Sequence, residues 1–352
     1  MIRPIFLAGA VLSLLPVSSW ASAPRVAVDI APLHSVVTQV MKGVGEPELL
    51  IQPEASPHSY SLRPSEAEAL AEAQVVFWIS GELTPWLENS LENLAGSANR
   101  VEMLELSETV KYGFREGATF EAHAHGEHGA EGGHDKHSGG QDSHDQHHDE
   151  HDEPHDAHDE HQDEYHEDHH AGHDGHHHGE HDPHAWLDPM NAKIWSAEIA
   201  QVLSEVDSAN ASVYQNNARD FAESMDNLIA SLQERANHIK GIRFIVFHDA
   251  YQYFERRFGL LAAGAISVSD ASDPSPARIR EIQSMVAELG VTCAFTEPQY
   301  DPGLVKTVFE GSEVKTVGVM DPLGADLQIG GSQYSQLLEG LMGSLEKCRQ
   351  KP

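Results

Sequence analysis

The sequence predicts an α/β fold made of two halves, each built from parallel βα units. Short apolar runs rich in β-branched residues alternate with helical patterns in the first half of the chain, and the same alternation returns in the second half. Between the halves, residues 209–240 contain neither Pro nor Gly and have a helical pattern. At about 1.5 Å per residue, a helix of this length could join two lobes.

The elements of each half follow from these patterns. In the first half, the strand-like runs are RVAVDI, ELLI, VVFWI and RVEML, and the helical runs are residues 34–43, 65–73 and 83–95. In the second half, the strand-like runs are RFIVF, TCAFT and VKTVGV, and a capped helix, SPARIREIQSMVAEL, is closed by Gly290. The length of 352 residues suits two domains and an extra segment. We therefore assign an N-terminal lobe to residues 22–205, a linking helix to 206–240 and a C-terminal lobe to 241–352.

The extra segment is an insertion in the N-terminal lobe, at residues 114–182. Between Glu121 and Asp182 there are 20 histidines, 20 acidic residues and one lysine, Lys136, so this stretch carries a formal charge of −19 of the total −34. It has almost no aliphatic residue that could enter a core, which predicts a disordered segment. The acidic balance argues against nucleic acid or anionic membranes as partners, because both would repel the chain.

The first residues predict a signal peptide at 1–21. Arg3 supplies a positive charge, IFLAGAVLSLLPV is an apolar run, and SSWASAP offers small residues for cleavage. Cutting after Ala21 is favoured, because cutting after Ala23 would leave Pro24 at the new N-terminus. An uncleaved anchor helix is the alternative. The expected compartment is a bacterial periplasm, or an anchored extracellular position.

The two cysteines, Cys293 and Cys348, both lie in the last sixty residues. In an exported protein this pair predicts one disulfide that ties a strand to the C-terminal helix. Two separate thiols are the alternative.

Five histidines lie outside the insertion, and three of them share a setting at element boundaries. His58 follows the strand ELLI, His184 precedes a helix, and His248 follows the strand RFIVF. Ligands bind at the carboxyl ends of strands in doubly wound sheets, so these three imidazoles could converge there. Three neutral imidazoles suit Zn²⁺ and leave a fourth position open. His238 is expected to complement the charge at a helix end. His34 is expected to have a structural role, with an approach to the cleft as a ligand as the alternative.

Each ligating imidazole usually donates its second nitrogen to an oxygen. Asp182, Asp188 and Asp249 are near the histidines in sequence and are candidates for this support. Glu297 and Asp321 each follow a predicted strand, so either could face the same crevice. Acidic residues beside Pro are also common turn formers.

Together these motifs resemble a known family. PHSYSLRPS, DPHAWLDP, FHDAYQYF, FTEPQYDP and MDPLGADL, in this order around an acidic histidine-rich insertion, resemble the ZnuA family of periplasmic zinc-binding components of bacterial ABC importers. The resemblance implies two βα lobes joined by a long, rigid helix, with Zn²⁺ held in the cleft as transported ligand by His58, His184 and His248. It also implies a membrane permease and an ATPase as partners. We expect a monomer.

The sequence departs from the family at one position. Some members have a glutamate ligand immediately before the first histidine, where this chain has Pro57. The fourth ligand is then water, Asp321 or a histidine of the insertion. Related manganese-binding members use two histidines and two carboxylates, and Asp321 lies where one of those carboxylates would fall.

The expected function is therefore zinc capture and delivery, with the insertion as a weak zinc collector. No enzymatic step is expected, and no GxxxxGK[ST] nucleotide loop is present. A three-histidine zinc hydrolase or lyase, a zinc-storing or adhesive surface protein, and manganese or nickel as the metal are the alternatives. Imidazoles titrate near pH 6.5, so collection should fail below about pH 6.

Overall fold

The computed structural model describes residues 23–115, 120, 180–267, 275–291, 293–300, 303, 305, 308–310 and 314–350. The predicted signal peptide and most of the predicted insertion lie outside these residues. The described residues belong to one compact unit. Within them, no helix has the length and apolar character needed to cross a membrane.

The first lobe contains four parallel strands in the order β2-β1-β3-β4. The strands are β1 (Val26–Val28), β2 (Glu48–Leu49), β3 (Val75–Trp78) and β4 (Asn99–Glu102), and the helices are α1 (Ala31–Met41), α2 (Pro64–Glu72) and α3 (Pro85–Leu94). Every residue of the two central strands is buried. Parallel strands covered on both faces have near-continuous apolar sequences, which is why these runs could be found in the sequence.

The second lobe repeats this arrangement, with parallel strands in the order β6-β5-β7-β8. Its strands are β5 (Phe244–His248), β6 (Gly264–Ser267), β7 (Cys293–Thr296) and β8 (Lys315–Val319), and its helices include α6 (Gln252–Phe258), α7 (Pro276–Leu289) and α9 (Gln333–Gln350). The central pairs are β1 with β3 and β5 with β7. In both lobes the order reverses at this central pair, which creates the type of crevice where α/β folds bind ligands.

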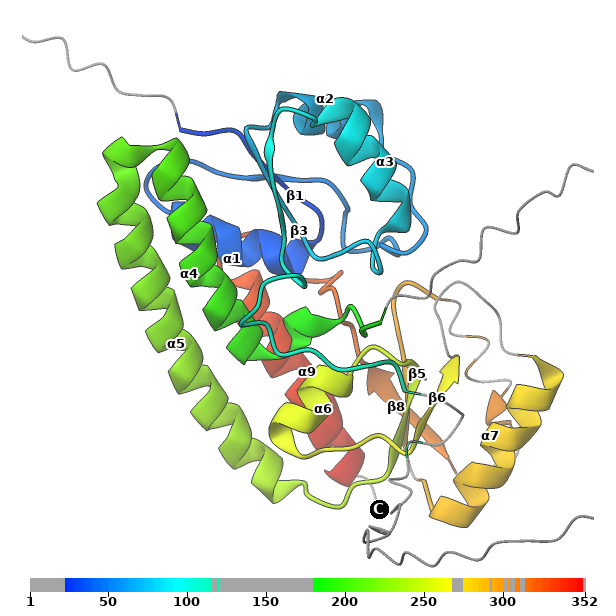
Figure 1. Ribbon diagram of the computed structural model, residues 1–352. Coiled ribbons are helices and arrows are strands. Elements are labelled where there is room, and N and C mark those ends of the chain that lie inside the picture. Colours follow the sequence, from blue (N-terminus) through cyan, green and yellow to red (C-terminus); the bar gives the residue numbers. More distant parts are fainter. Residues whose placement is uncertain are drawn as a thin grey trace, which may run out of the picture. The chain divides into compact units, whose positions relative to one another are not determined.

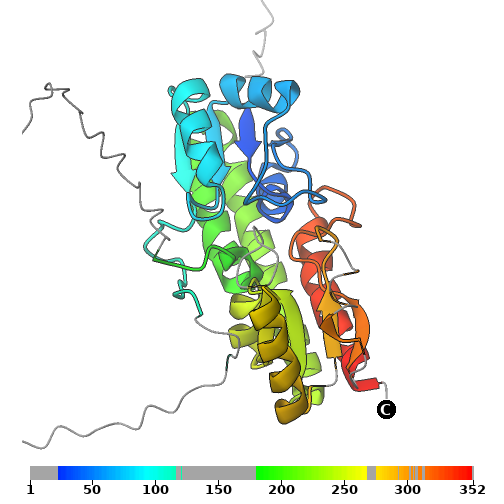
Figure 2. The same ribbon diagram turned by 90° about the vertical axis from the view of Figure 1, so that its right-hand side faces the viewer.

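Two long helices connect the lobes in sequence, α4 (Pro189–Val206) and α5 (Ala211–His238). The predicted long helix is present: α5 has 28 residues. It packs against α4 and α1, and also against α6 and α9 of the second lobe. Figures 1 and 2 show α4 and α5, in green, extending from the blue first lobe to the second lobe. The buried residues of α5 recur three or four positions apart and so form a single face. They are Tyr214, Ala218, Phe221, Met225, Leu228, Leu232 and Ala236.

The C-terminal helix α9 packs against α1 of the first lobe and β8 of the second. Near its start, the Tyr334 backbone N–H donates to Ser35 Oγ at 3.1 Å, and the Tyr334 hydroxyl donates to the Trp186 carbonyl at 2.6 Å. Near its end, Cys348 forms a disulfide with Cys293 of β7. The predicted disulfide between a strand and the C-terminal helix is therefore confirmed. One helix is thus fixed to both lobes.

Candidate metal centre

His58 lies in the loop between β2 and α2, and hydrogen bonds to backbone groups hold this loop. The Ile51 N–H donates to the Asp29 carbonyl at 2.9 Å. Trp86 Nε1, in α3, donates to the carbonyl of Pro57 at 2.7 Å. Pro57 offers no side-chain donor to a metal, but its fixed carbonyl positions the residue that follows it. His58 is half-buried.

His184 lies just before a short 3-10 helix, η1 (Ala185–Leu187), and Asp182 fixes its ring. Asp182 Oδ1 accepts from His184 Nδ1 at 2.7 Å and from the His184 backbone N–H at 3.0 Å. Gln252 Nε2 donates to the other oxygen, Oδ2, at 3.0 Å. Burial raises the pKa of Asp182 to about 6, although the hydrogen bond from the His184 backbone opposes this shift. In its charged form the carboxylate accepts from Nδ1–H and so fixes the tautomer of the ring.

His248 is the last residue of β5, and Glu297, which directly follows β7, fixes its ring. Glu297 Oε2 accepts from His248 Nδ1 at 2.6 Å, and Oε1 accepts from the His248 backbone N–H at 3.2 Å. Glu297 is 2% exposed. These two residues therefore meet across the central strand pair of the second lobe, at the point where the strand order reverses.

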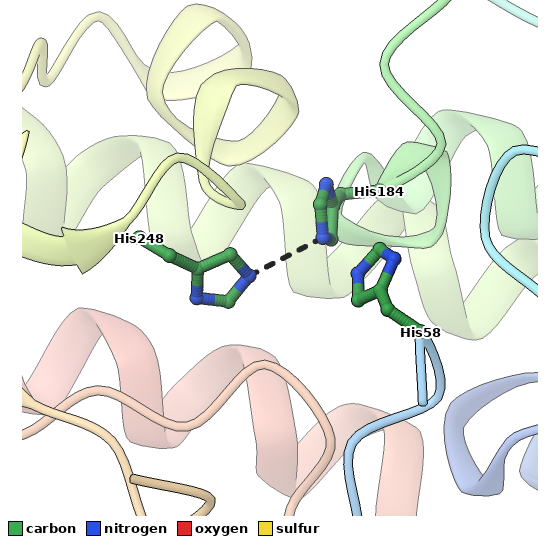
Figure 3. A group of neighbouring side chains, drawn as sticks. All are labelled: His58, His184 and His248. Atoms are coloured by element: carbon green, nitrogen blue, oxygen red, sulfur yellow. Dashed lines mark hydrogen bonds between the residues drawn. The ribbon is translucent and has the colours of Figure 1, made fainter. Parts of the chain in front are cut away.

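The three predicted ligands lie together (Figure 3). The His184 ring centroid is 5.4 Å from that of His58 and 5.2 Å from that of His248. One nitrogen of each ring lies within 4.8 Å of the others, and the Nε2 atoms of His184 and His248 are 3.4 Å apart. Two nitrogens bound to one tetrahedral zinc at 2.0–2.1 Å lie about 3.3 Å apart. The His184–His248 pair is thus at the separation that a shared zinc ion requires.

The tautomers of the His184 and His248 rings also favour a cation between them. The Nδ1 atoms of His184 and His248 each contact a buried carboxylate, so in the neutral rings the proton is on Nδ1. The two Nε2 lone pairs then face each other at 3.4 Å. Two facing lone pairs repel unless a cation lies between them, so this geometry favours a proton or a metal ion.

The histidines line a small cavity of about 10 Å³. This is about the volume that one water molecule needs. Trp186, Tyr300, Pro322 and Leu323 form apolar parts of its wall. Trp186 is held there, because its Nε1 donates to the Pro322 carbonyl at 2.8 Å. A cavity of this size suits a small occupant such as a metal ion.

The predicted supporting carboxylates divide into two groups. Asp182 contacts the ring of the predicted ligand His184, as expected. Glu297, which the sequence suggested only as facing the crevice, contacts the ring of the predicted ligand His248. Asp188 instead accepts from the Met190 N–H at the start of α4 and pairs with Arg257 at 2.6 Å. Asp249 pairs with Arg115. Glu297 could be found from its place after a strand, but its partner depends on strand order.

Arg115 forms a buried ion cluster beside the centre. It pairs with Asp249 and, at 2.7 Å, with Glu255. Burial alone would lower the pKa of the Arg115 guanidinium, but Glu255 and Asp249 raise it above its ordinary value. Burial raises the pKa of Asp249 and of Glu255, which Arg115 opposes. Asp249, which follows the predicted ligand His248, is therefore held by Arg115 at the start of the predicted insertion.

The other candidates lie elsewhere. The Asp321 carboxylate accepts from the Leu323 N–H at 2.9 Å and from the Ala325 N–H at 2.5 Å, as a turn-forming aspartate does. His34 Nε2 contacts the Pro47 carbonyl at 3.0 Å, and burial lowers the pKa of this histidine. His238 ends α5 and is exposed. Among the described residues, only the three predicted ligands form a possible metal-binding group.

Comparison with known proteins agrees with these observations. The sequence model of the family described as ZnuA, zinc-uptake complex component A, periplasmic, matches residues 26–348. The chain is 46% identical over 351 residues to the high-affinity zinc uptake system protein ZnuA of Brucella suis, and the match covers 99% of each chain. It is 45% identical over 349 residues to the protein of the same name from Paracoccus denitrificans, again with 99% of each chain covered.

A solved structure shows the same fold. The periplasmic zinc binding protein TroA from Treponema pallidum matches with a TM-score of 0.67 and 16% identity, over 92% of this chain and 97% of that one. This identity is low, so the match concerns the fold alone. The family model and the relatives together cover nearly the whole chain. The chain therefore belongs to the ZnuA family of periplasmic zinc-uptake components.

Proposed function

We propose that the chain binds Zn²⁺ through His58, His184 and His248 and delivers it to the permease and ATPase of an ABC importer. The family is one of zinc-binding components of uptake systems and not of enzymes. The observation that carries the ligand assignment is the pair of facing Nε2 atoms 3.4 Å apart, each in a ring whose Nδ1 contacts a buried carboxylate. These carboxylates fix the tautomer and make the rings more basic, so they favour metal binding.

Zinc titration against a competing chelator tests the assignment. Wild-type protein should bind one Zn²⁺ tightly, and His248→Ala should lose this site. His238→Ala is the matched control, because His238 is an exposed histidine at the end of α5. Tight binding that survives His248→Ala would contradict the assignment. The same titration with Mn²⁺ and Ni²⁺ tests the other metals, and three nitrogen ligands favour zinc over manganese.

We further propose that the histidine-rich insertion collects zinc weakly and supplies it to the tight site. The support comes from its two ends, which are anchored beside His184. The Asp182 N–H donates to the Tyr112 carbonyl at 2.8 Å, and the Tyr253 hydroxyl donates to the Asp182 carbonyl at 2.7 Å. Gln252 Nε2 donates to the Gly113 carbonyl at 3.1 Å. Tethering raises the effective concentration of weakly bound metal near the site.

Deletion of residues 122–177 separates the role of the insertion from that of the three-histidine site. This deletion keeps Asp182, which fixes the His184 ring. The shortened protein should keep one tight zinc and lose the weak ones. Loss of all tight binding would instead favour a storage or adhesion protein in which the insertion is the main site. In the full chain, weak binding should disappear below about pH 6, as protons displace metal from imidazole.

We also propose that residues 1–21 are removed on export and that the mature protein is a monomer. The family is periplasmic, in agreement with export. Intact mass of the protein recovered from the periplasm gives the cleavage site, and a mass beginning at residue 22 is expected. Light scattering with and without zinc gives the oligomeric state.

A further inference from the structure

Gln299 lies in the loop after β7, two residues beyond Glu297, and lines the same cavity as the three histidines. Its side-chain nitrogen Nε2 donates to the Pro53 carbonyl at 2.9 Å, in the loop that carries His58. It also donates to Asp321 Oδ1 at 3.2 Å. Gln299 therefore connects the loop of the first lobe to the second lobe at the edge of the cavity.

These two acceptors fix the orientation of the Gln299 amide. An amide has a donor end and an acceptor end, and its orientation is decided by its hydrogen-bond partners. Reversing it would place Oε1 against the Pro53 carbonyl and the Asp321 carboxylate, which are both acceptors. Neither Pro53 nor Asp321 lines the cavity, whereas Gln299 does. The acceptor end is thus directed away from them.

Gln299 Oε1 is buried and has no hydrogen-bond partner among the described residues. The Oε1 atoms of Gln252 and Gln333 share this property, but only Gln299 lines the cavity. A buried acceptor without a donor costs free energy, so such groups are normally satisfied by protein or by ordered water. A donor within hydrogen-bond distance would satisfy Oε1.

We propose that Gln299 Oε1 accepts a hydrogen bond from a water molecule that completes the coordination of zinc. This rests on the proposed function. Three imidazoles leave one of four tetrahedral positions for water. Pro57 has no side-chain ligand, and both Asp321 oxygens accept hydrogen bonds from its own turn. Zinc makes its bound water more acidic and therefore a stronger donor, which suits a neutral amide oxygen. Gln299 is a positioning residue that holds this water.

Two variants separate the acceptor Oε1 from the donor Nε2. Gln299→Met keeps the length of the side chain and removes both. Gln299→Glu removes the donor to Pro53 but keeps an acceptor oxygen, which can hold the water or replace it on the metal. The matched control is Gln39→Met, because Gln39 Nε2 also donates to a backbone carbonyl distant in sequence, that of Gly331 at 2.8 Å, and does not line the cavity.

The measurements are zinc affinity by chelator competition and the visible absorption spectrum of the Co²⁺-loaded protein, which reports the metal's coordination. Gln299→Met should still bind one zinc, about 10-fold more weakly, which is the size of effect seen when a group supporting a metal ligand is removed. Its Co²⁺ spectrum should change. Gln299→Glu should bind zinc more tightly than Gln299→Met, because it keeps an acceptor oxygen, and Gln39→Met should match wild type in both measurements.

The outcomes separate the possible roles. If Gln299→Met and Gln299→Glu weaken zinc equally and leave the Co²⁺ spectrum unchanged, Gln299 only ties the Pro53 loop, and the proposal is wrong. Wild-type affinity in Gln299→Met also overturns it. Both results leave the proposed function standing, provided that His248→Ala still loses the tight site. If wild-type protein has no tight site that depends on His248, the proposed function itself fails.

Discussion

Replacing Glu297 with Gln should weaken zinc binding strongly, although Glu297 is not a proposed ligand. Its carboxylate, which is fully buried, accepts from both the backbone N–H and the Nδ1–H of His248. In Glu297→Gln, the backbone N–H still needs the amide oxygen, so the NH₂ group faces Nδ1. The ring proton must then move to Nε2, the atom that should bind zinc. A hydrogen bond to a charged group contributes about 1.5–3 kcal/mol. A loss of about 2 kcal/mol corresponds to about 30-fold in affinity.

Chelator competition at pH 7.5 measures this loss, and thermal unfolding in EDTA checks that the metal-free variant is folded. Glu346→Gln is the control. Glu346, on α9, forms a partly exposed ion pair with Arg235, on α5, at 2.8 Å. It should change zinc affinity very little. If Glu297→Gln bound zinc with wild-type affinity while folded, the carboxylate would not set the tautomer of His248, and the assignment of Nε2 as the ligand atom would lose its main support.

Three further predictions concern the boundary of the site and the stability of the fold. His184→Ala should abolish tight zinc binding, and His181→Ala should leave it nearly intact; equal losses in a zinc titration would mean that the boundary between insertion and site is misplaced. Burial raises the pKa of Asp29 from 3.8 to about 7, so the folded chain keeps a proton that the unfolded chain releases. Its contribution to stability is present below about pH 4 and falls by up to about 4 kcal/mol as the pH rises through 7. Urea unfolding across this range should show a smaller fall for Asp29→Asn, and equal falls would contradict the pKa. Replacing Cys293 and Cys348 with Ala opens a loop of 55 residues and should lower the free energy of unfolding by about 4 kcal/mol; chemical denaturation measures this, and an unchanged midpoint would exclude a stabilising disulfide.

The fold could be predicted from the sequence because its central strands are fully buried. Runs such as VVFW at Val75–Trp78 are apolar at every position and stand out from the helical segments around them. The edge strand β6 was missed, since Gly264–Ser267 reads GAIS and has a single β-branched residue. The seven-residue helix α6 was also missed. A signal for its end was present in Gly259, which has a left-handed φ of 67°.

The three predicted ligands could be chosen from the sequence for a different reason. His184 and His248 stand at element boundaries and His58 lies in the loop after β2, and such places can be located from the sequence alone. Their partners depend on three-dimensional contacts. Asp249 is adjacent to His248 but pairs with Arg115, whereas Glu297, 49 residues away, reaches the ring because β5 and β7 are neighbours in the sheet. Strand order could not be derived from the sequence, so this partner could not be assigned.

The three proposed ligands are far apart in the chain, and this gives the cargo a mechanical role. The ion would join segments separated by 126 residues, from His58 to His184, and by 64 residues, from His184 to His248. It would act as a reversible cross-link beside the permanent one between Cys293 and Cys348. At a free zinc concentration of one hundred times the Kd, binding adds about 2.7 kcal/mol to stability, close to the contribution of a disulfide. Zinc-bound protein should therefore resist proteases better than zinc-free protein. When zinc is scarce, the protein should be degraded faster.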